Sequence, residues 1–236
     1  MIDQFSRLKI IVGEEALFKL KGKHVCVFGL GGVGGNVCDA LARSGIEQFT
    51  IIDNDQVEIT NINRQLIANM NNIGEDKVDV MERHIKSINP KAIVIKKKLF
   101  YLPNNSDIDF DEFDYVIDAI DTVSAKIDII KRCKENNIPI ISALGCGNKL
   151  DPCQIEISDI YKTSYDPLAK VLRKQLKLLG IKSLKVVYSK EKSIKPVEPL
   201  PVKEDSKRRS IPGSSAFVPP VAGIIIASEV IKDLLI

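Results

Sequence analysis

The sequence has few cysteines and no closely spaced cysteine pair. Its 236 residues include five cysteines and no C-x-x-C motif, which argues against a structural zinc site. No secretory signal precedes the first predicted elements. We therefore expect a reduced, cytoplasmic setting in which the cysteines form no disulfides.

Long hydrophobic runs are also missing. The longest, residues 216–227, contains two prolines and is too short to cross a bilayer, so we expect no transmembrane segment. Peripheral attachment of the C-terminal region to a membrane remains open.

Positive and negative charges nearly balance over the whole chain, but they are unevenly distributed along the sequence. Hydrophobic residues make up 44% and charged residues 28%, the proportions of a folded globular protein. The net charge is +3, yet residues 168–210 hold 13 Lys and Arg against 4 Asp and Glu, a net +9 that leaves −6 for the remainder. A basic segment on an acidic body predicts a polyanionic partner.

A cluster of glycines lies directly after an apolar run. Residues 24–28 have no polar face, which is typical of a buried parallel strand, and Gly29, Gly31, Gly32 and Gly34 follow at once. Because glycine has no Cβ, the backbone N–H groups of this turn can approach a phosphate at the start of the next helix. The pattern predicts a phosphate-binding turn; glycines that serve only helix packing are the alternative.

An acidic residue follows the second predicted strand. Residues 49–52 form another short apolar run, which ends at Asp53, so Asp53 falls at the carboxyl edge of the sheet, where such folds bind nucleotides. Its distance from the glycine turn suits a carboxylate that binds a ribose. We therefore expect a nucleotide, and at this point both NAD and ATP fit.

The rest of the chain alternates strand-like and helix-like patterns. We predict further strands near residues 92–99, 115–120, 138–142, 154–157 and 184–188, and helices near residues 14–20, 33–44, 75–87, 124–136, 168–179 and 221–235. This alternation predicts an α/β fold with a doubly wound, mainly parallel, Rossmann-like sheet, a mixed C-terminal extension and a terminal helix.

We interpret residues 1–236 as one domain with two parts. Residues 1–145 would form the nucleotide-binding core, and residues 146–236 an extension that binds the substrate. Within the extension, residues 189–210 are rich in Pro, Lys and Glu, which predicts a mobile loop.

Three charged residues help to separate ATP from NAD. Arg64 and Lys77 can neutralise the oxygens of a triphosphate, and Asp121 at a strand end can hold Mg²⁺. A dinucleotide makes little use of these charges, because the glycine turn already binds its diphosphate. Each residue also has a plainer explanation, as a surface cation or a helix N-cap, but their joint occurrence favours ATP and Mg²⁺.

One face of the predicted helix over residues 168–179 is basic. Lys170, Arg173, Lys174 and Lys177 recur at helical spacing. Like charges on one face repel one another, so an anionic partner is one explanation, and a solvated helix surface is the other.

Together these motifs resemble the ThiF/MoeB/HesA family of adenylating enzymes, which are relatives of ubiquitin-activating enzymes. The matching segments are residues 29–34, 53–55, 61–65, Lys77 and 118–121. The resemblance implies ATP and Mg²⁺ as cofactors. It assigns the ribose to Asp53, the phosphates to Arg64 and Lys77, the metal to Asp121, and supporting roles to Asp55, Asn61 and Gln65.

The same resemblance implies a homodimer. In that family, an arginine that matches Arg7 reaches the ATP bound by the neighbouring subunit. Without the resemblance, Arg7 would be interpreted as an ordinary surface residue, since its sequence neighbours give it no evident role.

The second half of the chain resembles the branch of this family that dehydrates threonylcarbamoyladenosine in tRNA. The matching segments are residues 145–152, 166–169, 186–189, 212–214 and 217–220. The chain departs from that branch at Cys146, where a small alanine-like residue is expected, and we assign Cys146 no role. The ThiF and MoeB branches carry two zinc-binding cysteine pairs, which this chain lacks.

This resemblance implies a reaction and a partner. ATP would activate the threonine carboxylate as an acyl-adenylate, and the ureido oxygen of the same group would then close a ring and expel AMP. The partner would be a tRNA anticodon stem-loop, with its phosphates held by Lys170, Arg173, Lys174 and Lys177.

Three other functions remain under consideration. The first is adenylation of the C-terminus of a ubiquitin-like sulfur-carrier protein, and a sulfur-relay protein is a further candidate partner. The second is an RNA-binding module that binds a nucleotide without turnover. The third is an NAD-dependent dehydrogenase.

Overall fold

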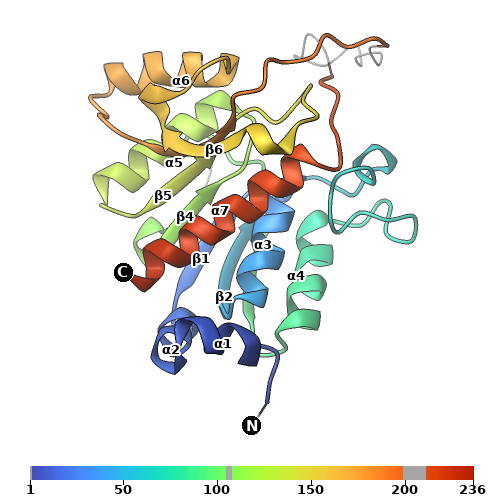
Figure 1. Cartoon of the computed structure of the whole chain (residues 1–236), viewed down its shortest axis with the longest axis vertical. Helices are drawn as coiled ribbons and strands as arrows, with labels where there is room; N and C mark the ends of the chain where they lie inside the picture. Colours follow the sequence, from blue (N-terminus) through green and yellow to red (C-terminus); the bar gives the residue numbers. More distant parts are fainter. Residues whose placement is uncertain (1, 105–107, 199–210) are drawn as a thin grey trace.

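The protein is built around one seven-stranded sheet. The computed structural model describes residues 2–104, 108–198 and 211–236 (Figure 1). The strands are β1 (His24–Phe28), β2 (Gln48–Ile52), β3 (Ile93–Lys97), β4 (Tyr115–Asp118), β5 (Ile140–Ala143), β6 (Ile155–Asp159) and β7 (Lys185–Ser189). They lie in the order β3-β2-β1-β4-β5-β7-β6, and only the β6–β7 pair is antiparallel. The predicted doubly wound fold with a mixed C-terminal end is confirmed.

Seven α-helices in the described residues surround the sheet. They are α1 (Ser6–Val12), α2 (Glu14–Lys21), α3 (Gly34–Arg43), α4 (Lys77–Ile88), α5 (Val123–Glu135), α6 (Pro167–Leu178) and α7 (Val218–Leu235). The sequence analysis did not predict α1 as a separate helix. Gly13 divides it from α2, because its φ of +86° interrupts the helical backbone at a residue that accepts this angle without strain.

The helices form two layers, one on each face of the sheet. The first core combines apolar residues of α2, α3, α4 and α7 with β1 and β2, and Figure 1 shows α3, α4 and α7 in front of the strands. The second core combines α5 and α6 with apolar residues from the segment that leads to β4. Because both faces are covered, the central strands are apolar on both sides.

The terminal helix α7 packs within its own chain. Ala222, Ile226 and Val230 are buried against the first core. The close approach to α3 requires Gly223, since a Cβ there would lie 2.8 Å from the Cβ of Asn36. The apolar terminal helix is therefore buried within its own chain. Among the described residues, no helix is both long enough and apolar enough to cross a membrane.

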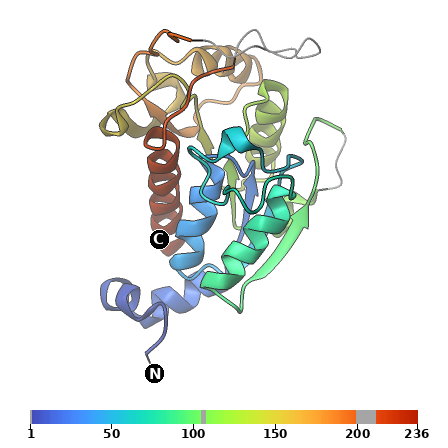
Figure 2. The ribbon, with the colours of Figure 1, turned by 90° about the vertical axis from the view of Figure 1, so that its right-hand side faces the viewer.

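The parallel strands bring distant segments to one edge of the sheet. Phe28, the last residue of β1, pairs in register with Ile52 of β2 and Asp118 of β4, and Ile52 pairs with Lys97 of β3. The segments that follow all four strands therefore emerge together, at the upper end in Figure 2. The helices α1 and α2 lie at the opposite, amino end.

Some predicted boundaries differ from the structure, and one predicted segment falls largely outside the described residues. Strand β4 ends at Asp118, before the predicted end at residue 120, and Ala119 and Ile120 lie against Gly29 of the glycine turn. Most of the loop predicted near 189–210 lies outside the described residues, which resume at Ile211.

Candidate nucleotide-binding site

A cavity of about 770 Å³ opens at the carboxyl edge of the sheet. Most of the predicted nucleotide-binding residues line it: Gly29, Gly31, Gly32, Asp53, Asp55, Asn61, Arg64, Gln65, Lys77 and Asp121. They come from the glycine turn, the end of β2, the segment that follows it, the start of α4 and the end of β4. Segments more than ninety residues apart along the chain thus form one site.

The glycine turn is tightly packed beneath this cavity. Gly29 has a φ of +88°, and a Cβ there would lie 2.8 Å from the carbonyl oxygen of Ala119. Gly34 does not line the cavity; a Cβ there would collide with the carbonyl oxygen of Gly29. Gly34 therefore allows α3 to approach β1, which is the packing role that was the alternative for the glycines.

Asp53 connects the glycine turn to the segment that follows β2. Its carboxylate accepts hydrogen bonds from the backbone N–H of Leu30 at 2.7 Å and of Asp55 at 2.8 Å. Desolvation is the largest influence on its pKa and raises it, while Lys77 and the backbone hydrogen bonds oppose that rise; the net pKa is above the ordinary value. The glycine turn and the end of β2 are thus joined through one carboxylate.

Lys77 is a buried cation at the first position of α4. The residue is 4% exposed, and its Nζ donates to the carboxylate of Asp55 at 2.8 Å. The backbone N–H of Lys77 also bonds to the carbonyl of Asp55 at 3.0 Å. Asp55 itself remains exposed, and its carboxylate holds the Lys77 ammonium group at the cavity wall.

Arg64 is held by the short 3₁₀ helix η1 (Ile59–Asn61). Its guanidinium donates to the carbonyl of Thr60 at 2.9 Å and to the side chain of Asn63 at 3.0 Å. Asn61 is buried and accepts a hydrogen bond from the backbone N–H of Glu58 at 3.2 Å. Partial burial lowers the pKa of Arg64, but the guanidinium stays charged at neutral pH because its ordinary pKa is far higher.

Gln65 carries an unsatisfied acceptor beside the cavity. The residue is 6% exposed, and its Oε1 is buried without a hydrogen-bond partner within the described part of the chain. A buried polar atom of this kind costs free energy unless a donor reaches it. The atom therefore indicates a ligand or an ordered water with a donor group at this place.

Asp121 is an exposed carboxylate on the cavity wall, directly after β4. Thr122, rather than Asp121, is the N-cap residue of α5, so the alternative role as N-cap does not apply. Among the described residues, no group of three His, Cys, Asp or Glu side chains could hold a metal ion. One carboxylate is nevertheless enough for Mg²⁺ when phosphates and waters supply the other ligands.

The sequence analysis missed part of the cavity wall. Residues 98–101, which follow β3, and Ile211 also line it. The sequence analysis extended the third strand to residue 99, whereas β3 ends at Lys97. Residues 98–101 could have been predicted to line the cavity, because β3 is parallel to β2 and the segment after it must emerge at the same edge of the sheet. The sequence did not indicate that Ile211 lines the cavity, because this residue comes from the far end of the loop before α7.

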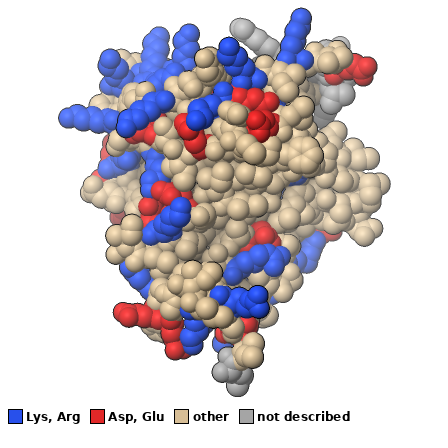
Figure 3. Space-filling view, viewed as in Figure 1, with Lys and Arg blue, Asp and Glu red and all other residues tan. Residues whose placement is uncertain are grey.

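The remaining predicted site residues lie elsewhere. Arg7 is exposed on α1, at the amino end of the sheet. Lys170, Lys174 and Lys177 are exposed on α6, and Figure 3 shows blue side chains gathered at the top of the molecule, where α6 lies. Arg173 instead turns inward and donates to the Thr163 carbonyl at 3.2 Å and to the Thr163 hydroxyl.

Together, the doubly wound sheet and the charged cavity define a nucleotide-binding α/β enzyme with groups for a triphosphate. The sequence pattern of the ThiF family matches residues 4–235, and the chain belongs to that family. A relative from Bacillus subtilis, the tRNA threonylcarbamoyladenosine dehydratase, is 43% identical over 100% of this chain and 96% of that protein.

Solved structures of related proteins have the same fold. The Escherichia coli dehydratase TcdA in complex with ATP superimposes with a TM-score of 0.86 at 34% identity, covering 98% of this chain and 93% of that one. A less similar relative, the adenylyltransferase and sulfurtransferase MOCS3 of Aedes aegypti, is 29% identical over 60% of this chain and 33% of that protein.

Proposed function

We propose that this chain is an ATP-dependent tRNA threonylcarbamoyladenosine dehydratase. The observation that carries the proposal is the cavity in which Arg64, Lys77 and Asp121 meet beside the glycine turn. The 43% identity to the Bacillus subtilis dehydratase, along nearly the full length of both chains, supports the proposal.

The residues present fit a nucleoside triphosphate. The glycine turn leaves space for phosphate oxygens, the cations Lys77 and Arg64 stand on the wall, and the unsatisfied Gln65 Oε1 can accept from a bound donor. Asp53 would bind a ribose hydroxyl, as the acidic residue after the second strand does in other doubly wound folds. In this arrangement the protein neutralises and positions the phosphates, which is the main requirement of adenylate formation.

Mg²⁺ would be held by Asp121 together with the triphosphate. The fit rests on a single exposed carboxylate, which suits a hard cation that keeps most of its ligands as phosphate oxygens and water. When bound, the metal would supply charge neutralisation at the phosphates.

The reaction needs no covalent enzyme intermediate. Once the threonine carboxylate is activated as an acyl-adenylate, the ureido oxygen of the same group attacks it, and ring closure releases AMP. The attacking and attacked groups belong to one molecule, so positioning supplies much of the rate. Cys146 is accordingly given no role, and burial raises the pKa of its thiol to about 11.

A homodimer would bring Arg7 to a nucleotide site. Within one chain, Figure 2 shows α1 at the lower end of the sheet and the start of α4 towards the upper end, where the residues that line the cavity lie. Ile10 and Ile11 on α1 are each 81% exposed, which is the kind of surface that an isologous interface covers. In such a dimer each subunit would donate Arg7 to the cavity of the other.

The RNA would lie on the face that carries α6. Lys170, Lys174 and Lys177 are exposed on α6, and Figure 3 shows basic side chains gathered at the end of the molecule where α6 lies. Phosphate contacts of this kind give affinity that falls steeply with salt. Arg173 would contribute indirectly, because its guanidinium is bonded to Thr163.

AMP formation on a defined RNA tests the proposal. The full chain is incubated with ATP, Mg²⁺ and an anticodon stem-loop with or without threonylcarbamoyladenosine. We expect AMP and a product 18 Da lighter, roughly the mass of one water, only with the modified RNA, because only its carboxylate can be activated. AMP formation that is equal with both RNAs would contradict the proposal.

Two lysines of α4 provide a matched pair for this experiment. Lys77→Met removes the buried cation of the cavity, and we expect at least a ~100-fold loss of AMP formation. Lys86→Met removes a surface lysine that pairs with Glu82 at 2.7 Å on the same helix and should retain wild-type activity.

Adenylation of a sulfur-carrier protein is the second candidate function. The same cavity would serve it, and the MOCS3 similarity supports it more weakly. Incubation of the chain with ATP and a ubiquitin-like carrier protein would then release pyrophosphate in the absence of any RNA.

A further inference from the structure

Tyr165 is an exposed tyrosine in a backbone conformation that tyrosine rarely adopts. Its φ angle is +54°, in the left-handed region where a bulky residue is an outlier. The residue is 62% exposed, so burial of the ring does not compensate for this conformation. The surrounding structure must therefore impose it.

Buried polar groups hold the turn on both sides. Asp166 is 4% exposed, and its carboxylate accepts hydrogen bonds from the backbone N–H of Ala169 at 2.8 Å and of Gly145 at 3.0 Å. Before the turn, Arg173 donates to the carbonyl and hydroxyl oxygens of Thr163. The exposed ring is thus mounted on a rigid support, and Arg173 acts as a positioning residue for it.

Tyr165 differs from the other tyrosines in the use of its hydroxyl. The other four tyrosines donate theirs to Asp128, Asp233, the Ile181 carbonyl and Glu156. Within the ranges that the structure describes, the Tyr165 hydroxyl has no protein partner. Instead, the Nζ of Lys192 lies over the ring, 5.0 Å from its centroid, in a cation–π contact.

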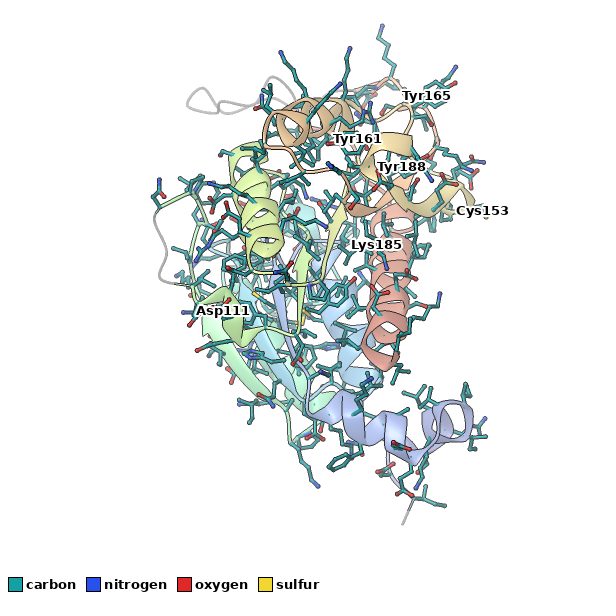
Figure 4. The ribbon with its side chains drawn as sticks, turned by 90° about the vertical axis from the view of Figure 1, so that its left-hand side faces the viewer. Asp111, Cys153, Tyr161, Tyr165, Lys185 and Tyr188 are labelled. Carbon is teal, nitrogen blue, oxygen red and sulfur yellow. The ribbon has the colours of Figure 1, made fainter. Side chains whose placement is uncertain are left out.

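The ring stands on the edge of the molecule where the substrate would bind. Gly145, to which Asp166 bonds, follows the carboxyl end of β5, and α6 with its exposed lysines begins at Pro167. Figure 4 shows Tyr165 at the top of the molecule, among the protruding side chains of this region. An aromatic face, a cation beside it and a basic helix are therefore neighbours.

We propose that Tyr165 is a stacking platform for an unpaired base of the RNA substrate, with Lys192 beside the adjoining phosphate. The proposal deepens the proposed function and rests on it. Unpaired bases in RNA loops are recognised by stacking on exposed aromatic rings within a basic surface. A ring on a rigid turn loses little conformational freedom on binding. The strained backbone therefore favours binding by holding the ring in place before the RNA binds.

Fluorescence of a modified stem-loop tests the platform. An anticodon stem-loop with threonylcarbamoyladenosine carries 2-aminopurine at a loop position beside the modified base or, as the control, within the stem. Binding to the full chain is measured for the wild type, Tyr165→Phe and Tyr165→Gly. Glycine suits the positive φ, so Tyr165→Gly should fold as the wild type does, which thermal unfolding checks.

We expect the loop probe to be quenched by the wild type and by Tyr165→Phe, because both retain an aromatic ring. Tyr165→Gly should lose this quenching and bind about five- to 100-fold more weakly, while the stem probe responds equally to all three proteins. Equal affinity and equal loop quenching with Tyr165→Gly would overturn the platform and leave the proposed function intact. A wild-type chain that neither binds the stem-loop nor forms AMP with it would overturn both.

Discussion

Asp53 shows at the residue scale how a nucleotide site can cost stability. Its pKa is raised above the ordinary 3.8 mainly because burial disfavours the charged carboxylate. The folded chain therefore holds this proton more tightly than the unfolded chain does. The resulting stabilisation is complete below the unfolded pKa and is lost as the pH rises through the folded pKa.

The variant Asp53→Asn should reveal this dependence because its side chain cannot ionise. We expect the unfolding free energy of the wild type, relative to the variant, to decrease as the pH rises above about 4, the ordinary pKa of an aspartate. Urea unfolding without nucleotide measures the difference. Two stability curves that stay parallel over this range would contradict the assignment. Nucleotide affinity at neutral pH should be lower in the variant, since the ribose loses its carboxylate.

Lys77 and Asp55 illustrate a second point at this scale. Both were expected to act on the nucleotide, and the structure shows them bonded to each other at 2.8 Å. Because Lys77 is buried and Asp55 is exposed, the carboxylate offsets the cost of burying the Lys77 cation at the cavity wall. The identity of each residue was predictable, but their pairing depended on a turn that brings α4 back towards β2.

At the scale of elements, a buried ion pair joins β4, β5 and α5. Lys126 is fully buried, and its Nζ donates to Asp118 at 2.8 Å, to Ser142 at 3.1 Å and to the carbonyl of Ala143 at 2.8 Å. Ser142 also donates to Asp118 at 2.6 Å. This network fixes the ends of the two strands just before the chain turns towards Asp121.

We expect Lys126→Met to destabilise the fold by ~3–5 kcal/mol, because it leaves the Asp118 carboxylate buried and unpaired. Lys131→Met is the matched control on the same helix. Its exposed ion pair with Glu135 spans 3.7 Å, so its loss should change stability by less than ~0.5 kcal/mol. Denaturant unfolding measures both variants, and equal stabilities would show that the buried pair is dispensable.

The double variant Lys126→Met with Asp118→Asn separates charge from packing. It removes the unpaired carboxylate and should recover part of the lost stability. A double variant that is less stable than Lys126→Met alone would show that Asp118 contributes chiefly through its hydrogen bonds to Ser142 and the neighbouring backbone.

At the scale of the whole molecule, the position of Arg7 makes a prediction about assembly. Arg7 belongs to α1, which lies at the amino end of the sheet, and Lys77 lines the cavity at the carboxyl edge. If each subunit lends Arg7 to its partner, Arg7→Ala and Lys77→Met damage complementary halves of one composite site.

We expect each single variant to be inactive and a co-expressed one-to-one mixture to regain about a quarter of wild-type activity, because half of randomly paired dimers contain one intact site of two. AMP formation with the modified stem-loop measures this recovery. A mixture as inactive as its parents, although dimers form, would place Arg7 outside the site.

The order of motifs along the chain was sufficient to predict the fold and most of the site. Apolar runs followed by Gly29 and by Asp53 place a glycine turn and an acid at one sheet edge, since parallel strands must end on the same side. For that reason Arg64, Lys77 and Asp121 were expected to converge, and the structure places all three in one cavity.

Other features were decided only by tertiary structure, because they depend on contacts between segments far apart in the sequence. Ile211, which follows β7 in the sequence, lines the cavity. Gly34 does not line the cavity and instead allows close packing of α3. The Arg173 side chain on α6 donates a hydrogen bond to Thr163. Local periodicity assigns a residue to a strand or helix face, but the bonding partner of a long side chain is set by whichever segment folds beside it.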